Sequence, residues 1–312
     1  MQGIELSEKY YNQFGKQMIE RDFSEYQNRI AVGICGEGSE CFVYDDEISV
    51  DHDFDMGFCL FITKEDYKKI GFKLERAYAN LPKEFLGYKR QNIMPVGGNR
   101  KGVIVIEDFY KHFLGVEDVP QDENWWFYVP ETSLACVSNG KIFRDDLGKF
   151  SQVRKKLIKG YPQDVRLKKI AAHLILAGQS GQYNYNRCLS HGEIGAAALA
   201  VDEFVRHCIS LIYLLNNKYQ PFYKWAFKGL RDLPILSDCE TALEGLLDFG
   251  NRGQEGKMKI EIIEDVSSII INQLKEQKLT MATCNNLETH AFSVTDKISN
   301  ANIRNMHIME GI

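Results

Sequence analysis

The stretch RIAVGICGEGSECFVYDDEISVDHDFDMGFCLFIT, residues 29–63, decides the fold of the first part of this chain. It opens with a short apolar run rich in branched residues, at 29–35, and closes with a second apolar run, at 57–63. Short runs of this kind that stop at glycines or acids are typical of buried strands. We therefore predict two core strands joined by a tight turn, Gly36-Glu37-Gly38-Ser39, and by an acidic segment.

The sequence on either side of this stretch alternates between helix and strand patterns. Residues 5–28 and 64–82 carry apolar residues three and four positions apart, which is the period of an amphipathic helix. A third strand-like run, GVIVI, follows at 102–106. The order helix, strand, turn, strand, helix, strand predicts an α/β (α+β) domain with a small mixed sheet.

The strand patterns stop near residue 150, and helical periods take over. Three long periodic segments lie at 164–180, 192–217 and 257–279, separated by short runs that carry Gly or Pro. We predict two closely packed domains: residues 1–148 with the mixed sheet, and residues 149–312, which are all helical. A cleft between two such domains is where ligand sites tend to lie.

Composition narrows the classes of partner. The 312 residues include 38 basic and 43 acidic side chains, a net charge of −5 spread along the chain. This argues against nucleic acid, whose binding rests on clustered Lys and Arg, and favours a small-molecule or protein partner. The eight cysteines form no CxxC pair, and we expect half of them to be small buried hydrophobes. With no signal-peptide pattern and no apolar run of about 18 to 20 residues, we expect a soluble, cytoplasmic protein that makes no membrane contact.

The turn and the acidic segment together carry the chemistry. Two glycines let backbone amides approach phosphate oxygens, and the Ser39 hydroxyl adds a donor. On an extended chain Asp51, Asp53 and Asp55 project to one face, where carboxylates two residues apart can share divalent cations. Concentrated like charge costs stability unless a cation offsets it. The pattern thus predicts a nucleoside triphosphate site that uses Mg²⁺ or Mn²⁺.

A plainer interpretation of the same residues stays open. Acidic residues beside a turn are usually a solvated loop, and a lone GxGS is a weak motif. His52 lies between the carboxylates on the opposite face, where a core or hydrogen-bonded histidine is the ordinary expectation. The position between two apolar strands is what favours phosphate and metal chemistry.

The order of strand, Gly-Ser turn and D-x-D spacing resembles the nucleotidyltransferase superfamily, which includes the kanamycin nucleotidyltransferases and the small MNT-type enzymes. More closely, GEGSECFVYDDEISVDHDFDMGFCLFI resembles the DUF4037 family, bacterial proteins with an amino-terminal nucleotidyltransferase domain. The resemblance continues through GKIFRDDLGKFSQVRKKLIKGYPQDVRLKKIA to KYQPFYKWAFKGL, so it covers roughly residues 25–235.

The resemblance implies roles for single residues. It implies Gly38 and Ser39 for the triphosphate and Asp51 and Asp53 for the metals. Asp55 departs from the family pattern, which has glycine at that place, and Asp53/Asp55 fits the generic D-x-D spacing as well as Asp51/Asp53 does. The register of the metal ligands is therefore open, and Asp55 is a candidate third ligand.

Superfamily members often use a third carboxylate on a later strand, as a metal ligand or as the general base for the acceptor hydroxyl. Glu107, at the end of GVIVIED, is the candidate here. Glu107 and Asp108 could instead simply begin the next helix, where acids suit the helix dipole.

A second charged cluster follows in IFRDDLG, residues 142–148. The family likeness favours a nucleotide-binding role for Asp145, with Arg154 or Lys155 near a phosphate. The structural alternative is that the acids cap a helix and that Arg154 is exposed.

The helical half contributes the residues that we expect to bind the acceptor. Arg187 and Glu193, like Gln182, lie in a polar turn between two long helices, and loops on rigid helices often carry recognition. Lys224 stands in a stretch that resembles a family motif in which lysine meets substrate or a carboxylate. We predict that Arg187, Glu193 and Lys224 face the metal site across the cleft.

The predicted activity is metal-dependent nucleotidyl transfer. An acceptor hydroxyl would attack the α-phosphorus of a triphosphate, ATP being the expected one, and pyrophosphate would leave. The alternative is a non-catalytic nucleotide-binding or regulatory module on the same fold.

Overall fold

The computed structural model describes residues 1–46, 56–90, 100–310 and 312. The chain forms two compact units: unit 1 comprises 1–121 and 129–159, and unit 2 comprises 122–128 and 160–312.

Unit 1 is built on a four-stranded mixed sheet with the order β5-β2-β1-β6. Its strands are β1 (Ala31–Ile34), β2 (Cys59–Ile62), β5 (Gly102–Val105) and β6 (Lys141–Arg144). β1 runs antiparallel to both β2 and β6, whereas β5 runs parallel to β2. The three strand-like runs of the sequence are thus strands, and β6 is a fourth that they did not predict.

Helices cover both faces of this sheet. They are α1 (Gly3–Tyr10), α2 (Lys16–Asp22), α3 (Lys64–Ala79), α4 (Ile106–Leu114), α6 (Glu131–Ser138) and α7 (Lys149–Ile158). A π-helical turn, η1 (Tyr11–Gly15), joins α1 to α2, and a 3-10 turn, η2 (Ser24–Arg29), leads into β1. The short strands β3 (Glu84–Phe85) and β4 (Tyr88–Lys89) form a separate hairpin.

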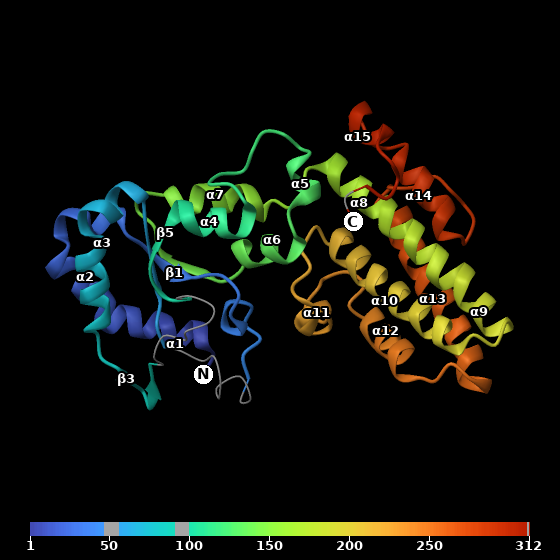
Figure 1. Cartoon of the computed structure of the whole chain (residues 1–312), viewed down its shortest axis with the longest axis horizontal. Coiled ribbons are helices and arrows are strands. Elements are labelled where there is room, and N and C mark those ends of the chain that lie inside the picture. The colour runs from blue at the N-terminus through green and yellow to red at the C-terminus, as the bar shows by residue number, and fades with distance from the viewer. Residues whose placement is uncertain (47–55, 91–99, 311) are drawn as a thin grey trace. The chain divides into compact units, whose positions relative to one another are not determined.

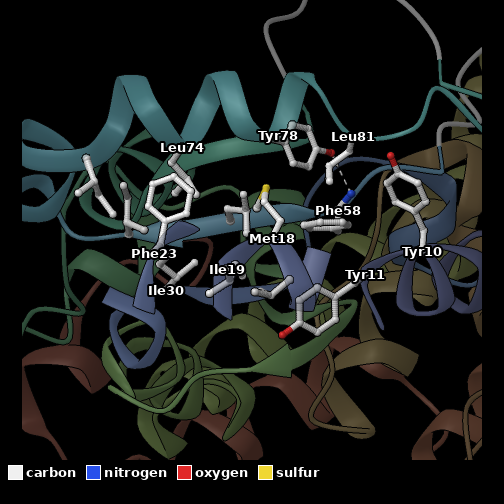
Figure 2. Packing of buried hydrophobic residues seen from close by; sticks show 14 of the residues in the cluster. Tyr10, Tyr11, Met18, Ile19, Phe23, Ile30, Phe58, Leu74, Tyr78 and Leu81 are labelled. Atoms are coloured by element: carbon white, nitrogen blue, oxygen red, sulfur yellow. Dashed lines mark hydrogen bonds between the residues drawn. The ribbon is translucent and has the colours of Figure 1, made fainter. Parts of the chain in front are cut away.

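One face of the sheet packs against α1, α2 and α3. Figure 2 shows Leu74 and Tyr78 of α3 facing Met18, Phe23 and Phe58. The Tyr78 hydroxyl accepts the backbone N–H of Phe58 at 3.1 Å, so this buried polar group has a partner. The apolar period at 5–28 and 64–82 therefore marks the helix faces that build this core.

The other face packs against α4 and α7. The ring of Phe150 in α7 stacks on Phe61 in β2 with centroids 4.1 Å apart, and Phe109 of α4 lies 5.4 Å from each of those two rings. This packing places α7 in unit 1. Apart from residues 122–128, which belong to unit 2, the compact units divide after Lys159, whereas the sequence places the boundary at 148.

Unit 2 is all helical (Figure 1). Its longest helices are α8 (Gln163–Ala177), α10 (Ile194–Leu215) and α13 (Gly253–Glu276). Shorter ones are α5 (Trp125–Tyr128), α9 (Asn186–Ser190), α11 (Tyr223–Leu230), α12 (Cys239–Asp248), α14 (Leu287–Thr295) and α15 (Ala301–Asn305). The predicted fold class, a small mixed sheet followed by a helical part, is confirmed.

A π-helical segment, η5 (Gly178–Tyr185), continues α8. A β-carbon at Gly181 would lie 2.3 Å from the ring of Phe204 in α10, just as one at Gly15 in η1 would lie 2.4 Å from Phe58. Each unit thus uses a glycine in a π-helical turn to bring a helix backbone against a phenylalanine ring.

The cysteines and the helices bear on what composition predicted. Five of the eight cysteines are buried, and all eight are free thiols. Within the described ranges, no helix combines the length and the apolar character needed to cross a membrane.

Candidate functional site

The candidate site is the turn that follows β1. The backbone at Gly36 has φ +133°, which favours glycine, and a 3-10 turn, η3 (Ser39–Cys41), comes directly after Gly38. Because Gly33 in β1 pairs with Cys59 in antiparallel β2, the end of β1 and the start of β2 meet at one edge of the sheet. The turn therefore lies at the edge where β2 begins.

The turn is held by residues about a hundred positions away. The side chain of Asn139 donates to the Gly36 carbonyl at 2.7 Å, and its amide oxygen accepts the Gly36 N–H at 3.0 Å. The neighbouring Gly140 N–H donates to the Cys41 carbonyl at 2.8 Å. Asn139 and Gly140, between α6 and β6, thus hold both ends of the turn, and we call these two residues the clamp. The sequence did not reveal this feature.

Arg154 holds this clamp. Its Nη2 donates to the backbone carbonyls of Ser138 at 2.8 Å, of Gly140 at 3.1 Å and of Asn139. These are carbonyls at the carboxyl end of α6, a place where a cation is favourable. Arg154 is therefore committed to the protein backbone in this structure, and its predicted contact with a phosphate stays a prediction.

Asp145 has a similar structural role. Its two carboxylate oxygens accept the backbone N–H groups of Gly148 and Ser151, each at 2.8 Å, so that it caps the start of α7. It directly follows β6, whose last residue, Arg144, pairs with Val32. Asp145 thus lies toward the edge of the sheet opposite the turn, and its contacts match the capping alternative.

Glu107 also lies at the opposite edge. β5 is parallel to β2, with Val105 paired to Ile62, so Glu107 follows the far ends of both strands. Its Oε2 accepts the Lys64 N–H at 2.9 Å, at the amino end of α3. The structure does not bring Glu107 to the turn, because a parallel strand ends away from the edge where β2 begins.

The turn forms one wall of a pocket of about 280 Å³. Gly36, Glu37 and Gly38 contribute from the turn, and Ile104, Phe109 and Phe113 supply apolar surface from β5 and α4. Asp108, rather than Glu107, is the acid of the IED sequence that lines it. Pockets that combine apolar walls with a few polar groups are typical ligand sites.

One ion pair and the thiols of the pocket wall are buried, whereas the lining residues Glu37, Arg100 and Asp108 are exposed. Lys101 Nζ lies 3.1 Å from Oε1 of Glu40, and both side chains are almost fully buried. Burial raises the pKa of Cys35 to about 11 and that of Cys59 to about 12. These thiols therefore stay protonated at neutral pH and are structural rather than nucleophilic.

The predicted metal ligands Asp51, Asp53 and Asp55 lie outside the described residues. In the sequence Asp55 is followed directly by Met56, which is buried and leads into β2. Earlier in the loop, Asp45 accepts the Gly3 N–H at 2.7 Å and caps α1. Among the described residues, no three His, Cys, Asp or Glu side chains are arranged to hold a metal ion.

The predicted acceptor residues of unit 2 do not come together. Arg187 in α9 and Glu193 lie at the amino end of α10, whereas Lys224 in α11 follows its carboxyl end (Figure 1). A 22-residue helix is about 33 Å long. The three side chains are exposed, and this separation means that they do not form one acceptor pocket.

Contacts of these residues are local. Arg187 lies over the ring of Tyr183, and Lys224 Nζ lies 4.3 Å from the ring centroid of Trp225. Gln182, in contrast, donates to Glu264 and to the Asn285 carbonyl and accepts the Leu287 N–H. Gln182 thus ties η5 to α13 and to the start of α14.

Comparisons with known proteins bear on the middle of the chain. Comparisons with curated proteins and with solved structures give no match. A family model does match, from α5 into α11, beyond the turn and the aspartate segment. Residues 126–226 match the model described as Domain of unknown function (DUF4037), and this match supports the DUF4037 family that the sequence predicted.

Proposed function

We propose that the chain is a nucleotidyltransferase that binds a nucleoside triphosphate at the Gly36–Ser39 turn and transfers its nucleoside monophosphate to an acceptor hydroxyl. The acceptor oxygen would form a bond to the α-phosphorus, the bond from that phosphorus to the β-phosphate bridging oxygen would break, and pyrophosphate would leave. The hydroxyl proton would pass to a carboxylate or to water.

The observation that carries this proposal is the pairing of β1 with β2. It puts the glycine-serine turn at the edge of the sheet where β2 begins, and β2 is the strand that the aspartate segment precedes in the sequence. Phosphate-binding backbone and metal-binding carboxylates must lie within a few ångströms of each other, since one cation contacts both the protein and the phosphates. The adjoining pocket provides room for part of a ligand.

Asp51 and Asp53 are the residues proposed to hold the metal, with Asp55 as a third candidate. A divalent cation bound there would offset the charge of the triphosphate and steady the leaving pyrophosphate. The contribution of the chain itself would be the fixed turn, since Asn139 and Gly140 hold it from outside.

Calorimetry with ATP, in the presence and absence of Mg²⁺, tests the proposal. The double variant Asp51→Asn/Asp53→Asn is expected to abolish metal-dependent ATP binding while the protein stays folded. Without metal it is expected to be at least as stable as the parent, because two like charges are removed. Equal ATP affinity in parent and variant would contradict the proposal.

A matched control removes the same charge elsewhere. Asp232→Asn/Asp248→Asn alters two exposed aspartates of unit 2 and is expected to bind ATP like the parent. Labelled ATP with a panel of hydroxyl acceptors, read as pyrophosphate release, then separates an enzyme from the alternative. Tight ATP binding with no turnover on any acceptor would favour the non-catalytic module.

A further inference from the structure

Glu40 lies directly against the second glycine of the turn. A β-carbon built on Gly38 would come 2.2 Å from Oε2 of Glu40 and 2.5 Å from its Cδ. Gly38 has φ −67°, a value that any residue adopts, so backbone freedom is not what requires glycine there. The close approach of the Glu40 carboxylate is what a side chain at position 38 would disturb, so the carboxylate packs directly on the turn.

Lys101 is the cation beside this carboxylate. Its Nζ lies 3.1 Å from Oε1, and the two side chains are 8% and 6% exposed. Lys101 directly precedes β5, and Gly102 pairs with Cys59, so Lys101 comes from the edge of the sheet that carries the turn. Both residues line the pocket. A buried charge that loses its partner is strongly unfavourable.

The charge of Glu40 acts on its surroundings. Burial raises the pKa of Cys41 well above its ordinary value, and the negative charge of Glu40 raises it further. A triphosphate on the same turn would feel that charge too, because like charges a few ångströms apart repel strongly where water is excluded. An uncompensated carboxylate at this place would thus oppose phosphate binding.

We propose that Lys101 is a positioning residue of the phosphate turn: it neutralises Glu40 and thereby fixes both the shape and the charge of the turn around Gly38. This inference rests on the proposed function, in which the turn binds the triphosphate. Lys101 acts through Glu40 and does not itself contact the phosphates.

A charge cycle tests this role by ATP calorimetry with Mg²⁺. Lys101→Met is expected to weaken ATP binding about 30-fold or more, because it leaves the carboxylate uncompensated. Glu40→Gln/Lys101→Met replaces the pair by neutral groups of similar shape, and it is expected to recover an affinity within about threefold of the parent. Lys101→Arg keeps the charge and is expected to keep the affinity.

The matched control is the exposed pair of Lys69 and Glu65, which are 2.6 Å apart in α3 of the same unit. Lys69→Met makes the same chemical change and is expected to leave ATP affinity unchanged. If the parent and Lys69→Met both fail to bind ATP, the proposed function fails and this inference with it. If the parent binds ATP and Lys101→Met binds equally well, only the inference is overturned.

The double variant decides the case even if Lys101→Met does not fold. If Glu40→Gln/Lys101→Met also binds ATP about 30-fold more weakly than the parent, the lysine contacts the phosphates directly. That result would overturn the positioning role. Recovery in the double variant, with retention in Lys101→Arg, supports it.

Discussion

Two polar regions of the molecule differ in how far along the chain their hydrogen-bond partners lie. One is the Gly36–Ser39 turn of unit 1, and the other is the polar segment from Gln182 to Glu193 of unit 2. The turn is fixed through Asn139 and Gly140, about a hundred residues later in the chain. In the segment Gln182 and Tyr185 are tied to distant residues through their side chains, whereas Arg187 and Glu193 are exposed. Long-range restraint of the backbone, rather than local polarity, is what distinguishes a candidate site from a solvated connection.

Two glycines test this difference most severely. Gly140 has φ +68°, and a β-carbon there would lie 2.0 Å from the Ile34 carbonyl oxygen; Gly192 has φ +73° with nothing within 4 Å. Gly140→Ala is expected to destabilise unit 1 by more than about 3 kcal/mol, since a backbone clash adds to the left-handed strain. Gly192→Ala carries the strain alone, about 1 kcal/mol.

Urea unfolding can separate the two units in this test. All three tryptophans, Trp125, Trp126 and Trp225, belong to unit 2, so their fluorescence reports on that unit. Circular dichroism reports on both. Similar losses of unfolding free energy in Gly140→Ala and Gly192→Ala would mean that the backbone at the clamp is packed no more closely than the backbone at Gly192.

The clamp itself can be removed without a clash. Asn139→Ala deletes both hydrogen bonds to Gly36 and is expected to cost about 2 kcal/mol of unfolding free energy, because a partly buried N–H and C=O lose their partners. Amide hydrogen exchange at 33–42 should accelerate. Arg187→Ala, at an exposed side chain, is the control, with an expected change within about 0.5 kcal/mol. Unchanged exchange in Asn139→Ala would contradict the clamp.

Unit 2 has a buried polar contact of its own, which predicts a response to acid. His173 Nδ1 lies 2.8 Å from His207 Nδ1, and His207 Nε2 lies 3.0 Å from Glu203. Burial lowers the pKa of His173 well below its ordinary value, and His207 and Lys169 lower it further. The folded state therefore keeps His173 neutral where the unfolded state, with a pKa of about 6.5, takes up a proton.

Because the unfolded state binds this proton and the folded state does not, acid destabilises the folded state. The stabilising share of His173 is fully present well above about pH 6.5, and lowering the pH from 7.5 to 5.5 is expected to remove about 1.4 kcal/mol. Burial also lowers the pKa values of His207 and His290, which add smaller losses of the same sign. Tryptophan-monitored unfolding of the parent and of His173→Asn at both pH values measures the difference. An equal pH slope in the two proteins would contradict it.

The smallest expected effect concerns ligand binding rather than stability. Ser39→Ala is expected to weaken ATP binding by about 1 kcal/mol, the range of one hydrogen bond, and to weaken AMP binding less. Ser190→Ala, whose hydroxyl donates to the Asn186 carbonyl at 2.9 Å, is the matched control in the polar segment. If ATP and AMP lose affinity equally, Ser39 supports the turn instead of contacting the terminal phosphates.

The sequence predicted the elements whose signal is local. Apolar runs marked β1, β2 and β5, and helical periods marked α3, α8 and α10. β6 was missed because KIFR has only two apolar residues on an edge strand. The helical periods also gave no sign of the π-helical turns η1 and η5. Their glycines, Gly15 and Gly181, pack against the rings of Phe58 and Phe204, which are distant in sequence.

The sequence predicted the turn at Gly36–Ser39, but it did not predict the residues that hold this turn. Gly36, Gly38 and Ser39 stand out locally because glycines follow an apolar run. Nothing near Asn139 or Arg154 in the sequence indicates that they restrain Gly36, since that requires the antiparallel pairing of β1 with β6. That Arg187, Glu193 and Lys224 face the metal site stays a prediction, although Arg187 and Lys224 lie near opposite ends of α10.

The clamp also sets an order of events during synthesis. The ribosome releases the turn early, but Asn139 and Gly140 emerge about a hundred residues later, and Arg154 later still. Contacts so distant in sequence form slowly, and until β6 emerges the edge of β1 that it covers is unpaired and prone to aggregate. We therefore expect nascent chains that stop before residue 139 to be the ones that recruit chaperones, and full-length chains that reach Arg154 to be released from them.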